Sequence, residues 1–272
     1  MADKLSGGAL AGRSQQIVFA PEKGEARFTY PDSLEVDFAK KAEFDAEKMD
    51  TTAINKKIRA LMRDGCGCIK IKNPGAKHSL AAGILNRLQL EIDGSVGYFG
   101  CGLNDGPNIR ISGRAGWSCA ENMMSGVVVV EKNAGSTFGA AIRGGDLVCR
   151  GDVGGRTGVC MKGGTIIVGG RTGAFSGFMM QRGRMLVLGD AGNNLGDTMY
   201  DGVIYVGGNI AGLGVDAAEV EMTPADCEWL KNKLALYGME APRGVENMRK
   251  ITSGKQLWNY DNLEPGEKKI VL

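Results

Sequence analysis

Four consecutive stretches of equal length decide the fold: GVVVVEKNAGSTFGAAIRG (126–144), GDLVCRGDVGGRTGVCMKG (145–163), GTIIVGGRTGAFSGFMMQR (164–182) and GRMLVLGDAGNNLGDTMYD (183–201). Each stretch is nineteen residues long and begins with glycine. The same step continues in a second glycine series, Gly97, Gly116, Gly135, Gly154, Gly173 and Gly192. A repeat near twenty residues is typical of a solenoid, in which each turn packs only on its neighbours.

The apolar residues keep the same spacing. One series is Leu90, Ile109, Val128, Leu147, Ile166, Met185 and Ile204, and another, two residues later, is Ile92, Ile111, Val130, Cys149, Val168, Val187 and Val206. Because two residues is the period of a strand, both series face one side. A further interior series is Met123, Ile142, Met161, Met180 and Met199. These patterns predict an all-β fold: a right-handed parallel β-helix, a single-stranded solenoid of 19-residue turns with flanking short helices and extended terminal arms.

The periodicity also divides the chain. The expected parts are an extended N-terminal arm (1–48), a helix and strand that lead into the solenoid (49–87), the glycine-rich β-helix (88–214), a C-terminal capping helix (215–238) and a C-terminal arm with Trp258 and Tyr260 (239–272).

Two helices flank the repeats. The first is predicted to start with Thr51 or Thr52 as N-cap and to end at Gly65, with Ile54, Ile58, Leu61 and Met62 on one face. The second starts with Thr223 as N-cap and Pro224 at the first helical position, and Gly238 can close it. It presents Trp229, Leu230 and Leu234, and we expect it to cover the open end of the solenoid.

Composition excludes several classes of protein. Net charge is +2 with 6% aromatic residues, which predicts no nucleic-acid partner. No run approaches eighteen apolar residues, and residues 1–12 lack the apolar core of a secretory signal, so we expect neither a membrane span nor secretion. Seven cysteines without disulfide spacing favour reduced thiols and a cytoplasmic location.

Few residues suggest chemistry. His78 is the single histidine, which argues against triads and zinc sites and favours a turn or interface role. Cys66 and Cys68 lack a second pair that would complete a metal site, so structural thiols are the favoured interpretation. The short glycine motifs are explained as corner residues. We therefore assign no catalytic, cofactor-binding or metal-binding residue to this chain.

An outward-facing series is more informative because it turns from charged to apolar. It begins with Glu91 and Arg110 and continues as Val129, Val148, Ile167, Leu186 and Tyr205. A contiguous apolar stripe of this kind needs a cover. We regard these last five residues, called the outer stripe below, as a candidate subunit interface, with coverage by the terminal arms as the alternative.

Several motifs resemble a known family. The runs 73–78 (NPGAKH), 94–98 (GSVGY), 120–126 (AENMMSG) and 177–180 (GFMM) are similar to the glycine-rich β-helix domain at the C-terminal end of the large glutamate synthase subunit. The resemblance covers about residues 50–235. A separate chain of this kind is most similar to the β-helix subunit of N-methylglutamate synthase, also called methylamine–glutamate N-methyltransferase.

The resemblance implies a scaffold in a multi-subunit, cytoplasmic enzyme. Its partners would be a glutamine amidotransferase-like subunit and an FMN-binding glutamate synthase-like subunit, and FMN and the iron–sulfur cluster would belong to a partner. Two alternatives stay open. One is the C subunit of a formylmethanofuran dehydrogenase or formyltransferase/hydrolase complex, and the other is a free-standing ligand-binding solenoid.

Overall fold

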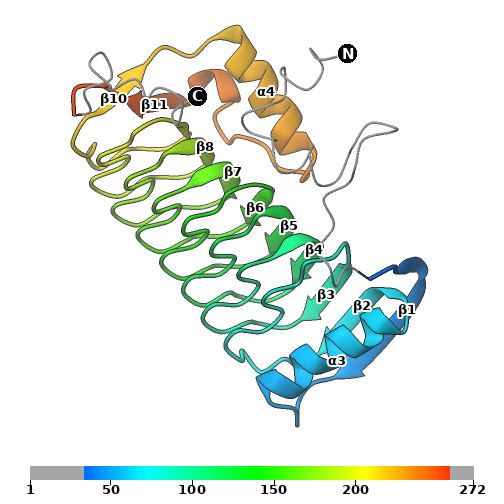
Figure 1. Cartoon of the computed structure of the whole chain (residues 1–272). Helices are drawn as coiled ribbons and strands as arrows, with labels where there is room; N and C mark the ends of the chain where they lie inside the picture. Colours follow the sequence, from blue (N-terminus) through cyan, green and yellow to red (C-terminus); the bar gives the residue numbers. More distant parts are fainter. Residues whose placement is uncertain (1–33, 258–272) are drawn as a thin grey trace, which may run out of the picture.

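The chain winds into a parallel β-solenoid of about seven turns, seen in a computed structural model that describes residues 34–257 (Figure 1). Successive turns each place one strand in a single sheet, in sequence order. The parallel strands are β1 (Asp37–Asp45), β2 (Cys66–Lys72), β3 (Gln89–Asp93), β4 (Asp105–Ile111), β5 (Ser125–Val130), β6 (Asp146–Cys149), β7 (Lys162–Val168), β8 (Arg182–Val187) and β9 (Val203–Val206).

Strand register confirms the nineteen-residue repeat. Val128 pairs with Leu147 and Leu147 pairs with Ile166, so like positions stack directly. Both inward series and the second interior series are buried in one continuous core, at no more than 2% exposure. The repeat therefore predicted the interior of the solenoid correctly.

Glycine serves two different purposes at the corners. Gly164 has φ +74°, in the left-handed region that glycine adopts without strain. Gly116 does not have positive φ, but a Cβ there would lie 2.6 Å from the carbonyl carbon of Gly97 in the turn below. Positive φ thus explains only part of the glycine pattern, because close stacking of backbone on backbone explains the series through Gly116.

The solenoid begins earlier than the sequence predicted. β1 lies within the stretch expected to be an extended arm, yet it pairs in parallel with β2, and β2 pairs with β3. Those turns break the repeat: Phe44 pairs with Ile71, twenty-seven residues later, and Ile69 pairs with Leu90, twenty-one residues later. The rest of the expected N-terminal arm, residues 1–33, lies outside the described residues.

The first helix, α3 (Thr51–Arg63), closes the N-terminal part of the interior. Ile54, Ile58 and Met62 are buried in the same core cluster as the solenoid strands. Its N-cap is Asp50, whose side chain accepts from the backbone N–H of Ala53, so the predicted caps Thr51 and Thr52 are wrong. Gly65 follows the helix with φ +82°.

The C-terminal part folds back onto the sheet. After β9 come β10 (Ala217–Val220), α4 (Pro224–Ala235), the short 3-10 helix η1 (Val245–Asn247) and β11 (Arg249–Ser253). β11 inserts antiparallel between β9 and β10. As far as residue 257, the expected C-terminal arm is therefore partly a strand of the sheet, while Trp258 and Tyr260 lie outside the described residues.

The second helix begins as predicted but lies elsewhere. Thr223 and Asp226 form a reciprocal capping box and Pro224 occupies the first turn. However, α4 lies along the outer face of the sheet beside β6 to β8 instead of across the open end (Figure 1). Its buried residues Leu230 and Leu234 contact the outer stripe.

Candidate functional site

The outer stripe is a continuous column of paired residues. Val129 pairs with Val148, and the pairing continues to Ile167, Leu186 and Tyr205 on successive strands. The last four side chains are at most 1% exposed, and Val129 is partly buried. They pack against residues of α4, of η1 and of the position that follows η1: Leu230, Leu234, Val245 and Met248. These four residues are therefore buried within the chain and are not exposed for a subunit contact in this structure. Their cover comes from α4, which was expected at the open end of the solenoid, together with part of the expected C-terminal arm.

We call residues 222–248 the C-terminal strap, and a first polar anchor fixes its middle. Asp146, on β6, is 9% exposed and accepts a hydrogen bond from Lys233 Nζ at 2.6 Å and another from the Tyr237 hydroxyl. Burial and the neighbouring Asp146 charge raise the pKa of Tyr237 above its usual range, so the hydroxyl stays protonated and donates. Arg150 donates to the carbonyl oxygen of Tyr237 at 2.9 Å.

A second anchor ties the start of the strap to the sheet. Asp226 accepts hydrogen bonds from Lys250 Nζ at 2.8 Å and from the Tyr205 hydroxyl at 2.6 Å, and also from Thr223. Burial alone would raise the pKa of Asp226, but these hydrogen bonds outweigh it and hold that pKa below its usual range. The guanidinium of Arg184 lies 4.4 Å from the ring centre of Trp229, which adds a cation–π contact.

Asp226→Asn is expected to lower the free energy of unfolding by about 3 kcal/mol at pH 7, because it leaves the Lys250 ammonium without its partner. Since the folded-state pKa lies below the unfolded value near 3.9, the carboxylate stabilises the fold fully above about pH 5 and loses this effect as pH falls through the folded-state pKa. The difference in melting temperature between wild type and variant should therefore stay constant from about pH 8 to pH 5 and become smaller below about pH 4.

The matched control for this variant is Glu228→Gln, an exposed carboxylate on the same helix. It should change stability by less than about 0.5 kcal/mol. A difference between wild type and Asp226→Asn that is independent of pH down to about pH 2 would contradict the ion-pair explanation.

A second surface has no cover among residues 34–257. The rings of His78, Tyr98 and Trp117 stack in successive turns, with centroid distances of 4.7 Å and 5.5 Å. Tyr98 and Trp117 are 44% and 57% exposed, and nearby in sequence Phe99 and Leu103 are 46% and 56% exposed. We call the three stacked rings the aromatic ridge. Their packing supports the predicted turn or interface role of His78, whose Nδ1 accepts from the Tyr98 backbone N–H at 2.8 Å.

Glycine makes the ridge possible. A Cβ at Gly116 would lie 2.7 Å from Cδ1 of Tyr98, and one at Gly135 would lie 2.3 Å from Cδ1 of Trp117. The rings of Tyr98 and Trp117 therefore pack directly on the backbone of Gly116 and Gly135 in the next turn, where a side chain would clash. Sequence reasoning missed the ridge because His78 precedes Tyr98 by twenty residues, one more than the repeat; the nineteen-residue step from Tyr98 to Trp117 was the available signal.

The cysteines lie in settings typical of structural thiols. Burial raises the pKa of Cys101 to about 12 and that of Cys149 to about 11, so both are protonated core residues. Cys66 is buried, and Cys68 Sγ lies 3.1 Å from the carbonyl oxygen of Phe38. Within residues 34–257, no group of three or more His, Cys, Asp or Glu is arranged to hold a metal ion. No helix in the same range is long and apolar enough to cross a membrane.

Known proteins resemble this chain mainly over its solenoid. The family model described as "GXGXG motif" matches residues 37–234, from the first residue of β1 to near the end of α4. Among curated proteins, "Protein GlxC" of Rhizobium meliloti (strain 1021) is 43% identical over 192 residues, covering 71% of this chain and 84% of the relative. The matched region therefore includes both the aromatic ridge and most of α4.

Proposed function

Because the chain belongs to the GXGXG-motif family, we propose that it is a non-catalytic scaffold subunit of a multi-subunit glutamate synthase-like enzyme. In this proposal it holds a glutamine amidotransferase-like subunit against an FMN-binding glutamate synthase-like subunit. FMN and the iron–sulfur cluster belong to a partner, and the complex is cytoplasmic. The specific reaction proposed is N-methylglutamate synthesis from glutamate and methylamine, because a separate chain of this kind resembles the β-helix subunit of N-methylglutamate synthase.

The observation that supports a scaffold role most is the aromatic ridge on a rigid solenoid. Exposed tryptophan and tyrosine are the residues that most often dominate the binding energy of protein interfaces. Trp117 and Tyr98 stack on each other and remain largely exposed, which is typical of a surface that another protein contacts. Each ring is held in place by the turn beneath it, so little conformational entropy is lost on binding.

Trp117→Ala is expected to weaken assembly with the amidotransferase-like and flavin-binding partners at least tenfold, because truncating a central interface tryptophan typically costs about 2 kcal/mol or more. The measurement is co-purification of the coexpressed chains, followed by titration of the isolated chain into its partners. The isolated chain should be colourless, with flavin absorbance in a partner. Leu236→Ala, at a 72% exposed residue just after α4, is the control and should leave assembly unchanged.

Two results would contradict this function. One is stoichiometric flavin or iron–sulfur absorbance in the purified chain alone. The other is failure of the wild-type chain to associate with either partner. If Trp117→Ala binds the partner subunits as tightly as wild type does, the ridge is not the contact surface. In all cases the melting temperature of Trp117→Ala should stay within a few degrees of wild type, because the ring is largely exposed.

A further inference from the structure

The aromatic ridge carries three ring donors that have no acceptor within residues 34–257. Nδ1 of His78 accepts from the backbone N–H of Tyr98 at 2.8 Å, so the hydrogen of the neutral imidazole lies on Nε2. That N–H, the hydroxyl of Tyr98 and the Nε1–H of Trp117 donate in none of the side-chain hydrogen bonds of this range. The indole is a donor only, so it needs an acceptor from a partner or from water. The exposed edge of the ridge therefore suits a partner rich in acceptor oxygens.

The faces of the same rings are largely occupied. The ring centres of His78 and Tyr98 lie 4.7 Å apart and those of Tyr98 and Trp117 lie 5.5 Å apart, with interplanar angles of 29° and 20°. The backbone of Gly135 lies against Trp117 from the next turn. Single-stranded nucleic acids bind aromatic side chains by stacking bases on open ring faces. Because the ridge offers edges with donors instead, it favours a protein partner over a nucleic acid.

Two cations lie close to the ridge without an ion pair. Arg114 is exposed and precedes Trp117 by three residues, so their Cα atoms are at most about 11 Å apart. The backbone N–H of Lys132, also exposed, donates to the carbonyl oxygen of Gly113 at 3.2 Å, which places Lys132 next to Arg114 in the adjacent turn. Neither side chain takes part in an ion pair in the described part of the chain. Glu131, which precedes Lys132, already pairs with two arginines of neighbouring turns.

The equivalent charge is neutralised further along the solenoid. Arg171 occupies the same corner position as Arg114, three turns of nineteen residues later. Its Nη2 lies 3.2 Å from Oδ2 of Asp152 in the preceding turn, so this guanidinium is paired within the chain. The residue that precedes Arg114 in the same series is Ser95, whose Oγ accepts the backbone N–H of Arg114 at 3.0 Å but carries no charge. Of these two corner arginines, the unpaired one lies in a turn that carries the ridge.

We propose that the surface formed by the aromatic ridge, Arg114 and Lys132 binds a carboxylate-rich segment of a partner protein, an inference that rests on the scaffold function proposed above. The guanidinium of Arg114 can hold a carboxylate through two parallel hydrogen bonds, and Lys132 adds a second positive charge. The ring donors accommodate further carboxylate or carbonyl oxygens. In such a contact the rings supply most of the affinity, while the charges speed association and fix the orientation of the partner.

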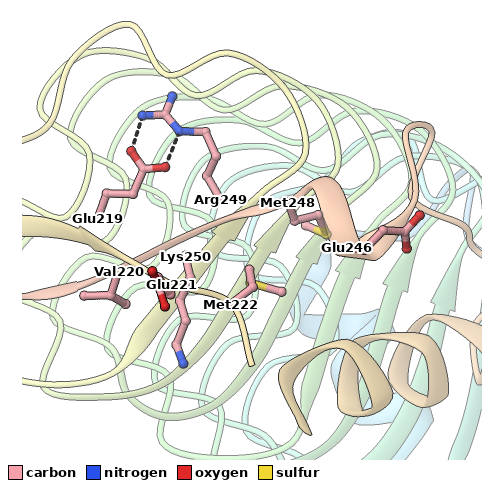
Figure 2. A pocket seen from close by; sticks show the side chains of 8 residues that line it. All are labelled: Glu219, Val220, Glu221, Met222, Glu246, Met248, Arg249 and Lys250. Atoms are coloured by element: carbon pink, nitrogen blue, oxygen red, sulfur yellow. Dashed lines mark hydrogen bonds and ion pairs between the residues drawn. The ribbon is translucent and has the colours of Figure 1, made fainter. Parts of the chain in front are cut away.

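A second copy of the chain also offers carboxylates. Figure 2 shows a hollow of about 510 Å³ over the paired strands β10 and β11, where Glu221 and Glu246 take part in none of the ion pairs found among residues 34–257. The hollow and the ridge lie in the last and the first turns, so each copy would use two different surfaces. A contact of this head-to-tail kind adds copies into rings or open filaments. We therefore assign the ridge to a different protein and keep self-association as an outcome of the test.

Titration of the full chain into its purified partner subunits at two salt concentrations tests this directly. Arg114→Gln should weaken binding at least about fivefold in about 50 mM salt and less than about twofold in about 500 mM salt, because salt screens charge pairs at an exposed surface. Arg171→Gln is the matched control, since it removes the same charge from the same corner position about 14 Å further along the solenoid. It should change the affinity less than about twofold in either salt. Both variants should melt within a few degrees of wild type, because both side chains are exposed.

The inference is overturned if Arg114→Gln and Arg171→Gln weaken binding equally, or if the loss with Arg114→Gln is the same in both salts. It is also overturned if nuclease abolishes the association, which would assign the surface to a nucleic acid. Self-association of the isolated chain that Arg114→Gln abolishes would assign it to a second copy. If wild type binds neither partner in either salt, the scaffold function fails and this inference fails with it. Weaker binding of Trp117→Ala together with unchanged binding of Arg114→Gln would keep the scaffold function and exclude the acidic partner.

Discussion

Val130→Asp is expected to abolish folding, because it places a carboxylate in the interior of the solenoid. Val130 is fully buried and is paired directly with Ile111 and Cys149 in the neighbouring turns. An unpaired buried polar group costs several kcal/mol, a large share of the roughly 5–15 kcal/mol that stabilises a domain. Expression should give insoluble protein, or a soluble chain without a cooperative thermal transition.

Val129→Asp is the matched control, since it changes the same side chain one residue earlier on the outward face. Val129 is partly buried at the margin of the outer stripe, beyond the four residues that the strap covers completely. We expect a loss of about 1 kcal/mol, measured by thermal or urea unfolding. Equal losses in the two variants would show that the two faces of β5 are assigned wrongly.

Gly116→Ala is expected to destabilise the chain by about 3 kcal/mol, at the upper end of the usual cost of overpacking. The added Cβ would lie 2.6 Å from the Gly97 carbonyl carbon and 2.7 Å from the Tyr98 backbone nitrogen. Because the obstructing atoms are mostly backbone, the clash is relieved only by separating two turns. The drop should be visible in chemical unfolding, together with a change in the tryptophan fluorescence of the folded chain as Trp117 is displaced.

Gly238→Ala separates this steric effect from backbone strain. Gly238 has φ +58°, but no atom lies within 4 Å of the position of its Cβ. Its substitution should therefore cost only about 1 kcal/mol, the usual penalty for a left-handed non-glycine residue. If Gly116→Ala costs no more than Gly238→Ala, close stacking does not explain the glycine series.

The repeat predicted the middle of the fold because stacking relates residues at a fixed spacing. Val128, Leu147 and Ile166 pair as their nineteen-residue step requires. The first turns could not be found in this way, since the steps from β1 to β2 and from β2 to β3 include a helix and a longer loop. Asp45, for example, carries no periodic signal, although it pairs with Lys72 in the sheet.

The repeat could not predict which segment covers the outer stripe, for another reason. The sequence showed an apolar column that needed a partner, and it showed α4 with its capping box. Nothing in either pattern joined them, because contacts such as Lys233 with Asp146 link residues eighty-seven positions apart. The aromatic ridge was missed for a simpler reason, the one-residue offset between His78 and Tyr98.

The position of the strap late in the sequence also determines how long the outer stripe stays uncovered, and prone to aggregation, during synthesis. Turns of the solenoid contact only their neighbours, so they can form while the ribosome is still translating later repeats. Val148 is made a hundred residues before Met248, which helps to cover it. At about 5–20 residues per second, the stripe stays bare for about 5–20 s on every nascent chain. During that interval the nascent chain exposes an apolar surface that is buried in the finished protein. Chaperones, or the same surface on another nascent chain, can bind it before the strap does.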